Sequence, residues 1–316
     1  MEKSKSDNLS KGDIISFIAL LLLGVTVFFG MNFSTLGDRI QSVVVSVVLV
    51  TLMVVFVFLA AFAKAQNRNQ AMWTKVEYAM LFLYVLALIP CYLYSSKFYD
   101  IQFNKTNIVK EVQANIDDIN KMFGDYDKKC QTRSFSYKTA LQAMSRDVQG
   151  RQKAGGILGI SASHVNAQAI DQASESFLNH FRGNDYSQLL SEKTALENSV
   201  LNNFKNWNIL LVPQYAEELG TAKEKYATGL QDIYDRYKGD IDGTEIPSFK
   251  ASDYMSSESV VEHFTDKGSF SLYGILSILV LGGLGLIKYF LGEKRTVIAL
   301  KQGDSSVIME DGGFSI

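Results

Sequence analysis

The side chains most ready for acid–base or metal chemistry are the three histidines, His164, His180 and His263. No two of them have the spacing of a helical metal site, and His164 and His180 would share a face only if one continuous helix joined them. The glycine run at 155–159 lacks the Gly-Lys-Ser/Thr ending with which a phosphate loop supplies its cation and its magnesium ligand. We therefore expect no metal, no cofactor and no enzymatic activity.

Cysteine usage and net charge set two further limits on function. Cys91 and Cys130 cannot form a disulfide framework, so we expect two unpaired thiols. The 31 basic residues are balanced by 33 acidic ones, which leaves no cationic surface of the kind that a phosphate backbone requires. Nucleic acid is therefore not expected as a partner.

The elements that must position these groups follow from the hydropathy of the sequence. Four strongly apolar blocks, at 14–31, 40–63, 76–94 and 271–291, each have about the 20 residues with which an α-helix crosses a bilayer. The first block is not followed by a small-x-small cleavage site, so we interpret it as a retained span and not as a signal peptide. We expect an all-α membrane protein whose four transmembrane helices are surrounded by membrane lipid.

Ionisable side chains are absent from the middle of these four blocks. Glu77 and Lys288 lie at block edges, where a charged side chain can reach the headgroups. A transporter or proton-driven motor needs such a group inside the bilayer to carry its ion. An ion-channel or motor subunit is therefore the weakest of the functions considered.

The distribution of lysine and arginine predicts the orientation, because basic residues are retained on the cytoplasmic side. With the N-terminus in the cytoplasm, ten basic residues near span ends lie inside and five lie outside. The inner ones are Lys3, Lys5, Lys11, Lys64, Arg68, Lys75, Lys288, Lys294, Arg295 and Lys301, and the outer ones are Arg39, Lys97, Lys105, Lys110 and Lys267. We expect residues 1–13 and 292–316 in the cytoplasm and residues 96–270 in the periplasm of a bacterium.

The polar segment 96–270 carries apolar residues at helical spacing, which predicts a bundle of helices. One stripe is formed by Ile108, Val112, Ile116, Ile119 and Phe123. This stripe is expected to continue the third span out of the membrane as one long helix. Segments 155–163 and 240–257 are rich in glycine, serine or proline and are predicted loops, the second leading back towards the membrane.

The clearest stripe in this segment is close to a heptad repeat. It is formed by Tyr215, Leu219, Ala222, Tyr226, Leu230, Ile233 and Tyr237. Pro213 stands just before its start and Gly239 just after its end. The stripe predicts a helix of about 25 residues that packs along a neighbour in the manner of a coiled-coil seam.

Small residues predict close contacts between the membrane helices, because glycine and serine let two backbones approach. In the fourth span these are Gly274, Gly282, Gly283 and Gly285, and in the second span they are Ser42 and Ser46. We expect the glycines to serve helix packing and assembly; for the two serines, a position near the membrane surface is an equal alternative. The tail beyond the last span has the pattern of a small hairpin, which would be more stable docked on a partner.

In length and layout the chain resembles the TssN family, membrane components of the type VI secretion systems of Bacteroidetes. The four apolar blocks and the polar insert between Tyr94 and Leu272 carry the resemblance. It implies a structural inner-membrane subunit of a trans-envelope complex that anchors a contractile injection apparatus. It also implies periplasmic subunits as partners of the bundle, and the cytoplasmic baseplate as partner of residues 64–75 and 292–316.

The main alternative is a sensor or signalling protein whose outer bundle binds a ligand and shifts the spans. Such a protein needs a cytoplasmic output domain, and the 25 residues of the tail are too few for one, so a partner would have to supply it. The packing glycines, the heptad seam and the lack of a catalytic constellation favour assembly over catalysis. We therefore expect an oligomer.

Overall fold

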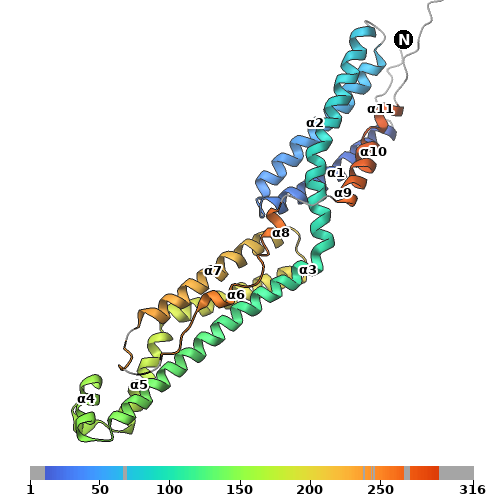
Figure 1. Ribbon diagram of the computed structural model, residues 1–316. Helices are drawn as coiled ribbons and strands as arrows, with labels where there is room; N and C mark the ends of the chain where they lie inside the picture. The colour runs from blue at the N-terminus through green and yellow to red at the C-terminus, as the bar shows by residue number, and fades with distance from the viewer. Residues whose placement is uncertain are drawn as a thin grey trace, which may run out of the picture.

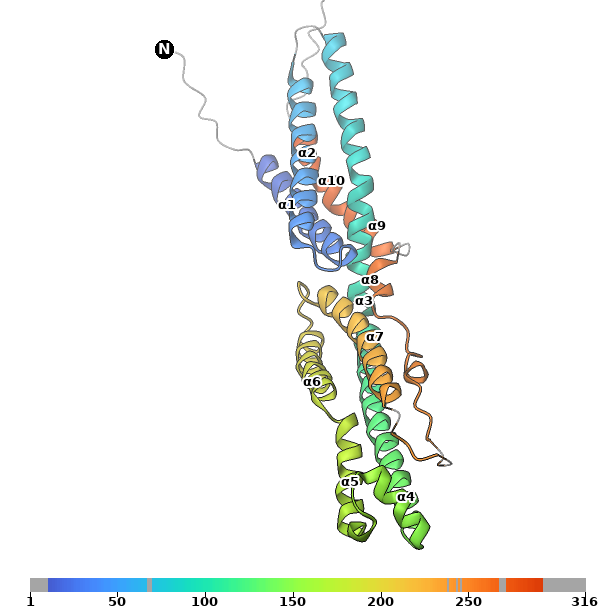
Figure 2. The same ribbon diagram turned by 90° about the vertical axis from the view of Figure 1, so that its left-hand side faces the viewer.

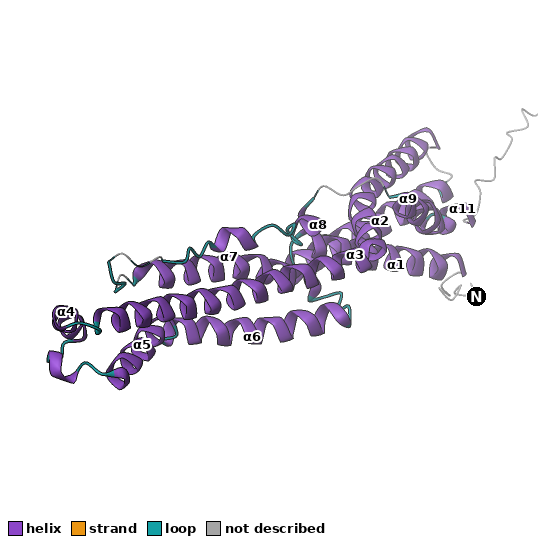
Figure 3. Ribbon diagram, turned by 60° about the horizontal axis from the view of Figure 1, so that its bottom comes forward, coloured by secondary structure: helices purple, strands orange, loops and turns teal. Residues whose placement is uncertain are grey.

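The structure, a computed structural model, describes residues 11–66, 70–237, 239–242, 244, 246–266 and 271–291. Within these ranges every regular element is helical, which confirms the predicted all-α class (Figure 3). Figure 1 shows an elongated molecule with two parts along its length. We call them the apolar end, residues 11–96 and 271–291, and the helical bundle, the described residues between 97 and 266. The predicted tail hairpin lies outside the described residues.

The apolar end is built from four helices that are long and apolar enough to cross a membrane, as the sequence predicted. They are α1 (Lys11–Ser34), α2 (Arg39–Ala65), the first part of α3 (Gln70–Met144) and a helical run from Leu272 to Leu291. That run comprises α9 (Leu272–Ser277), a π-helical turn η3 (Ile278–Gly282), α10 (Gly283–Gly285) and α11 (Ile287–Leu291). The four predicted spans fall on these helices, with Ser271 as the N-cap of α9.

The surface of the apolar end explains why lipid is its expected solvent. Most of the large apolar side chains that stay exposed lie on its helices, including Phe17, Val47, Phe82 and Leu279, each at least 50% exposed. A soluble monomer rarely leaves so large an apolar surface in water. In hydrocarbon the same surface is stable, because a helix satisfies its own backbone hydrogen bonds.

A single helix, α3, connects the two parts. It has 75 residues, which at 1.5 Å per residue make about 110 Å along its axis, and Figure 1 shows this axis changing direction between the apolar end and the bundle. Tyr84 and Cys91 of α3 belong to the hydrophobic core of the apolar end, whereas Ile108, Val112 and Leu141 belong to the core of the bundle. The prediction that the third span continues as one helix is confirmed, and α3 takes part in both cores.

The bundle packs its other helices beside the outer part of α3. These are α4 (Val148–Leu158), α5 (Ala167–Phe181), α6 (Asn184–Lys205) and α7 (Val212–Arg236). α5 covers the far part of α3, and α6 and α7 run antiparallel beside the part nearer the apolar end (Figures 1 and 2). The following segment, with η2 (Ala251–Tyr254) and α8 (Glu262–Thr265), returns along the bundle to the apolar end, as predicted for the linker.

The predicted loop at 155–163 is wrong in its first half. α4 continues through Gly155 to Leu158, and Gly159 ends it in the left-handed region, with φ of +67°. Glycine adopts this conformation at the end of a helix without the strain that a Cβ would cause. The chain turns after Gly159 and forms only a short helix, η1 (Ala162–His164).

The predicted heptad helix is α7, and its length of 25 residues agrees with the prediction. It begins at Val212, so Pro213 lies inside its first turn and not just before its start as predicted. Proline suits the first turn of a helix, because its missing N–H is not needed there. The seam residues Leu219, Tyr226, Leu230 and Ile233 are buried, and Tyr215, Ala222 and Tyr237 are half-buried against the same core. The stripe therefore forms the inner face of α7.

Candidate functional site

The predicted packing glycines of the last helix lie mostly against α3. A Cβ added to Gly274 would lie 2.8 Å from the Cα of Ser96. One added to Gly282 would lie 3.0 Å from Cδ2 of Leu88. At Gly274 the obstacle is backbone, which cannot turn aside, so this glycine sets how closely α9 approaches α3.

The other two predicted glycines differ from each other. A Cβ added to Gly285 would lie 2.6 Å from the hydroxyl oxygen of Tyr84 and 2.8 Å from Cδ2 of Leu20, so Gly285 packs against both α3 and α1. The Tyr84 hydroxyl donates a 2.7 Å hydrogen bond to the carbonyl of Gly282. Gly283 is exposed, with no other atom within 4 Å of an added Cβ. Gly283 therefore takes no part in packing within the chain.

Ser42 and Ser46, the small residues predicted on α2, are both buried. The Ser42 hydroxyl donates to the carbonyl of Asp38 at 2.6 Å, and the Ser46 hydroxyl donates to the carbonyl of Val43 at 3.0 Å. Each hydroxyl is thus satisfied within its own helix, as serine side chains can be. Because neither hydroxyl is needed for a bond to another helix, the contribution of Ser42 and Ser46 to packing is their small size, which lets a neighbouring helix come close.

Two glycines of α1 that the sequence analysis did not single out make tighter contacts than any of these. A Cβ added to Gly30 would lie 1.8 Å from the carbonyl oxygen of Tyr94 on α3. One added to Gly24 would lie 2.5 Å from Cγ2 of Val50 on α2. Two glycines within the first apolar block were the available signal, since small residues mark helix contacts in membranes.

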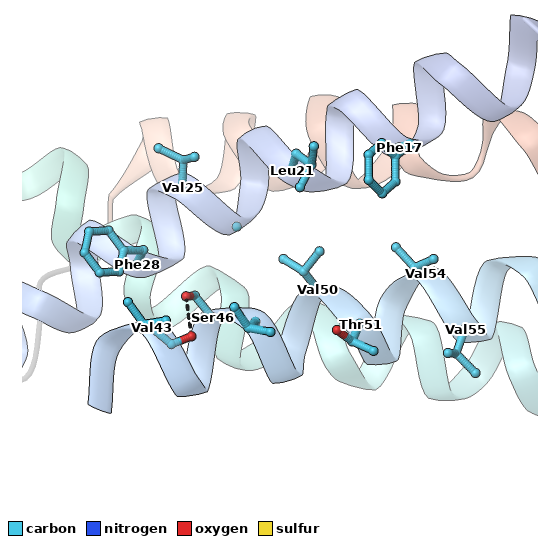
Figure 4. Close-up of a pocket in the computed structure, with 12 residues that line it drawn as sticks. Phe17, Leu21, Val25, Phe28, Val43, Ser46, Val50, Thr51, Val54 and Val55 are labelled. Carbon is cyan, nitrogen blue, oxygen red and sulfur yellow. Dashed lines mark hydrogen bonds between the residues drawn. The ribbon is translucent and has the colours of Figure 1, made fainter. Parts of the chain in front are cut away.

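An apolar groove between α1 and α2 runs along the surface of the apolar end (Figure 4). Its volume is about 580 Å³. Its walls include Phe17, Leu21 and Phe28 of α1 and Val43, Val50 and Val54 of α2. Among the described residues, its lining has two hydroxyls, those of Ser46 and Thr51, and no charged group. Such an apolar lining is suited to hydrocarbon.

At the end of the spans away from the bundle, charged residues join all four helices. The Lys288 amine lies 2.7 Å from a carboxylate oxygen of Asp13. The next residue, Tyr289, donates through its hydroxyl to Glu77 at 2.7 Å, and its carbonyl accepts a 2.7 Å bond from the Lys64 amine. The sequence analysis placed Glu77 and Lys288 each at the edge of its own span, on the side expected to be cytoplasmic, and the structure brings them to neighbouring positions of one network.

At the opposite end of the spans, where the two parts of the molecule meet, a buried lysine holds α8 against α3. Lys97 of α3 is 3% exposed, and its amine donates to the carbonyls of His263 at 2.7 Å and Asp266 at 2.8 Å. These carbonyls lie at the end of α8, where backbone acceptors lack helical partners. The His263 ring nitrogen lies 2.5 Å from a carboxylate oxygen of Glu111. The returning chain is therefore held on α3 at two levels.

Aromatic rings pack at the same junction. Phe33, at the end of α1, lies 6.4 Å from Phe98 of α3 and 5.9 Å from Phe264 of α8, measured between ring centroids. Gly37, in the turn between α1 and α2, comes so close to the start of α7 that an added Cβ would lie 3.3 Å from Cβ of Gln214. The bundle and the apolar end thus meet through direct packing as well as through α3.

The far half of the bundle contains a buried ion pair. Arg133 of α3 donates to both carboxylate oxygens of Asp240, to the Tyr234 carbonyl at 2.9 Å and to the Tyr237 carbonyl at 2.6 Å. Its side chain is 6% exposed and lies 5.0 Å from the ring centroid of Phe181. Burial lowers the pKa of Arg133, but the bonds to Asp240 raise it above its ordinary value. This pair holds the end of α7 and the residues after it on α3.

A second buried network lies nearer the apolar end. The Lys223 amine of α7 donates to Asn115 at 3.0 Å and to Asp118 at 3.1 Å, both on α3. Ser257 of the returning segment also donates to Asp118. Burial raises the pKa of Asp118, but the bonds from Ser257 and Lys223 outweigh it, and the pKa falls below its ordinary value. Three segments are joined at this one carboxylate.

The histidines and cysteines are dispersed. His164 lies in η1 and His180 on α5, so the turn after α4 separates the two, and His180 stacks on Tyr237 with ring centroids 4.7 Å apart. Within the described part of the chain, no group of three or more His, Cys, Asp or Glu residues could hold a metal ion. Cys91 and Cys130 are both buried and unpaired, and burial raises the pKa of the Cys130 thiol to about 12.

Comparison with known proteins gives no relative: no family model, curated protein or solved structure matches this chain. The fold alone therefore defines the class, a helical protein with four helices able to cross a membrane, one of which continues into a bundle. The bundle and the apolar end are joined by α3, by the rings of Phe33, Phe98 and Phe264, and by the close approach of Gly37 to Gln214.

Proposed function

We propose that this protein is a structural subunit of a trans-envelope assembly in the bacterial inner membrane, where it holds the bundle at a fixed distance from the bilayer. Such a role fits the resemblance to the TssN family and the anchoring of a contractile type VI secretion apparatus. The observation that carries the proposal is that α3 takes part in both hydrophobic cores.

The packing around α3 supports a mechanical role for this helix, in which it transmits force between its two ends. A long helix without neighbours bends easily, because its stability in proteins comes mainly from packing along one face. α3 has neighbours along its course: α1 and α2 in the apolar end, then α7, α6 and α5 in the bundle. Where the neighbours change, Lys97 and Phe98 hold α8 and α1 against it. A displacement at one end of α3 is thus transmitted to the other.

The proposed orientation has the bundle in the periplasm and both termini in the cytoplasm. Lys64 and Lys288 lie in the network at the end of the spans away from the bundle. Lysine is retained on the cytoplasmic side of a membrane. The turn containing Gly37 meets the start of α7 and so lies on the bundle side. A reporter enzyme that functions only in the periplasm should accordingly be active when fused at Asp185, and one that functions only in the cytoplasm should be inactive there.

The proposal is tested by interrupting α3 between its two cores. A short Gly-Ser insertion after Tyr99 should leave membrane insertion intact but abolish secretion by the apparatus, because the bundle is no longer coupled to the spans. The matched control is the same insertion after Ser161, in the exposed turn between α4 and α5, which should secrete as the wild type does. Normal secretion after the Tyr99 insertion would exclude the hypothesis that α3 transmits force between the spans and the bundle.

A second test concerns the partners. Purification of the full chain from detergent-solubilised membranes should recover envelope and baseplate components of the contractile apparatus. Recovery with a histidine kinase or another signalling output protein, and no secretion component, would overturn the proposal in favour of a sensor. Recovery of the chain with no partner at all would also contradict it.

A further inference from the structure

Two grooves of opposite charge lie on the two flanks of α6. The lysine groove, of about 600 Å³, lies between α3 and α6; Lys105, Val109, Lys110 and Val112 of α3 and Phe204 and Lys205 of α6 are among its lining. The glutamate groove, of about 480 Å³, lies between α6 and α7; Glu192 and Leu196 of α6 and Glu217, Glu218, Ala222 and Tyr226 of α7 are among its lining. We propose that the α7 side of a second copy of this chain binds in the lysine groove, so that copies join side by side around an axis normal to the membrane.

Among the described residues, no carboxylate neutralises the charges of the lysine groove, and no Asp or Glu side chain lines it. Lys105, Lys110 and Lys205 have no carboxylate within ion-pair distance among the described residues. The Lys105 amine lies 5.2 Å from the ring centroid of Trp207, a cation–π contact that leaves its charge without a counter-ion. Because the chain as a whole carries more acidic than basic residues, three lysines without a carboxylate partner around an apolar floor are a local excess that an anionic partner would balance.

The glutamate groove supplies the opposite charge. Glu192 is paired with Lys225 at 2.5 Å, but Glu217 and Glu218 have no cationic partner within ion-pair distance in the described part of the chain. Glu217 is exposed and Glu218 half-buried, so both can meet a neighbour. The two carboxylates give the α7 side of the bundle the charge that the lysine groove requires.

The two grooves overlap in height above the spans. Gln214, at the start of α7, contacts the turn between α1 and α2. At 1.5 Å per residue the α7 wall of the glutamate groove extends from there to Tyr226, about 18 Å further out, with Glu217 and Glu218 about 5 Å out. Phe98 of α3 packs on Phe33 at the same turn, which puts Lys105 and Lys110 about 10 to 18 Å further out. Helices fixed in a bilayer hold all copies upright, so grooves at such heights can meet without tilting.

The two grooves also point in different directions. At about 100° per residue, Lys205 lies roughly 180° around α6 from Leu196, so the two groove walls occupy opposite flanks of one helix. Figure 2 shows α6 standing beside α3 and α7 in the bundle. An interface between two different surfaces is heterologous and repeats from copy to copy, and closure of the repeat makes a ring.

This interface adds a mode of self-association to the proposed function. It rests on the proposed function only for its location in the periplasm. The first test combines Lys110→Cys and Glu217→Cys in one full-length chain. Native membranes that contain this double variant are treated with a bis-maleimide crosslinker. The double variant should give a ladder of dimers, trimers and larger species, and each single variant should stay monomeric, because the contact joins two different surfaces. Cys91 and Cys130 are buried and stay unreacted.

Each outcome of the crosslinking decides one point. A matched control pair, Lys128→Cys with Glu217→Cys, should give no ladder, since Lys128 lies outside both grooves. Dimers from a single variant, or no ladder from the double variant with a membrane-permeant reagent, would overturn the interface. A ladder with the permeant reagent but none with an impermeant one in spheroplasts would retain the interface and overturn the periplasmic placement instead.

Charge reversal separates a second copy from any other anion, such as a lipid headgroup. Lys110→Glu with Lys205→Glu, or Glu217→Lys with Glu218→Lys, should each weaken self-association in detergent about tenfold, as expected for the loss of a few exposed ion pairs. All four substitutions in one chain should restore it to within about threefold, because the complementarity is only exchanged. If the variant with all four substitutions did not regain self-association, the proposal that a second copy occupies the lysine groove would be wrong.

Discussion

The apolar end and the helical bundle are both made of packed helices, but they are held together by different means. In the apolar end, α1 and α9 approach α3 at residues without bulk, such as Gly30 against Tyr94 and Gly274 against Ser96, and a charged contact such as Lys288 with Asp13 lies at the end away from the bundle. In the bundle, large and charged side chains join the helices in the interior, such as Arg133 with Asp240. The difference fits the solvent expected around each part, which is lipid for the apolar end and water for the bundle.

The physical reason lies in what each part gains by packing. In lipid, apolar side chains gain little by leaving one hydrocarbon environment for another, so helices associate by close backbone approach. In water, the burial of Tyr126, Phe177 and Phe181 provides the main driving force. Such a core can also accommodate a buried ion pair when its hydrogen bonds are complete, as those of Arg133 are.

The two tryptophans make this comparison measurable. Trp73 lies in the apolar end, against Phe62, and Trp207 lies in the bundle, where its indole donates to Gln102 at 3.1 Å. With Trp73→Phe the fluorescence of the full chain reports unfolding of the bundle, and with Trp207→Phe it reports unfolding of the apolar end. Each prediction below uses one of these backgrounds in detergent.

The largest effect is expected when the buried ion pair of the bundle is broken. Asp240→Ala leaves the Arg133 charge buried without its carboxylate, and should reduce the free energy of unfolding reported by Trp207 by about 3–5 kcal/mol. The control is Asp185→Ala, which removes a pair with Arg236 in which both side chains are more than 60% exposed, and should cost less than about 1 kcal/mol. Equal effects of the two substitutions would refute the distinction.

The second effect concerns Asp118 and carries a pH signature. Asp118→Asn removes charged hydrogen bonds with Lys223 and Ser257 and should cost the bundle about 1.5–3 kcal/mol at pH 7. Because the folded-state pKa of Asp118 lies below its ordinary value of 3.8, its stabilisation is present above that value and is lost as the pH falls through the folded-state pKa. The difference between wild type and variant, followed through Trp207, should therefore shrink below about pH 4. A difference independent of pH would show that the charge is not what matters.

A third substitution tests the apolar end. Gly30→Ala places a methyl group where the Tyr94 carbonyl stands, and should cost about 1–3 kcal/mol in the stability reported by Trp73, with α1 displaced from α3. Gly283→Ala is the control, since an added Cβ there meets nothing within 4 Å, and it should leave the stability unchanged. If Gly283→Ala reduced the stability more than Gly30→Ala, packing within the chain would not explain how these glycines contribute to the stability of the apolar end.

The smallest effect is expected from a helix cap at the far end of the bundle. The Asn166 side chain accepts a 2.9 Å hydrogen bond from the amide of Ala169 at the start of α5. Asn166→Ala should cost about 1 kcal/mol, measured through Trp207. Ser161→Ala, at a residue whose side chain caps no amide, should cost less, and no change at Trp73 is expected from either variant.

Much of this fold was predictable because its patterns are strong and local. Each of the four apolar blocks has about the length needed to cross a bilayer, and the seam from Tyr215 to Tyr237 repeats without interruption along α7. The stripe from Ile108 to Phe123 likewise indicated that α3 leaves the apolar end without a break. The loop predicted at 155–158 failed for a local reason as well, since two glycines do not end a helix whose hydrogen bonds continue to Gly159.

The polar residues at the junction and in the bundle were not predictable in the same way. Arg133 falls in the phase of the apolar stripe that includes Tyr126, Cys130 and Tyr137, which is the one signal that it is buried. Nothing in the sequence indicates Asp240, more than a hundred residues away, as its partner. Lys97 likewise binds carbonyls of a short helix whose position depends on the whole return of the chain.

Apart from residues 155–158, the sequence by itself determined the main helical segments, which of them are apolar enough to cross a membrane, and which face of α7 turns inward. These properties follow from the order of residue types along a few turns of one helix. Only the tertiary structure decided that Gly30 meets Tyr94, that Arg133 meets Asp240 and that lysines of α3 and α6 line one groove. Such meetings depend on the relative rotation and position of helices distant in the sequence, which no local pattern specifies.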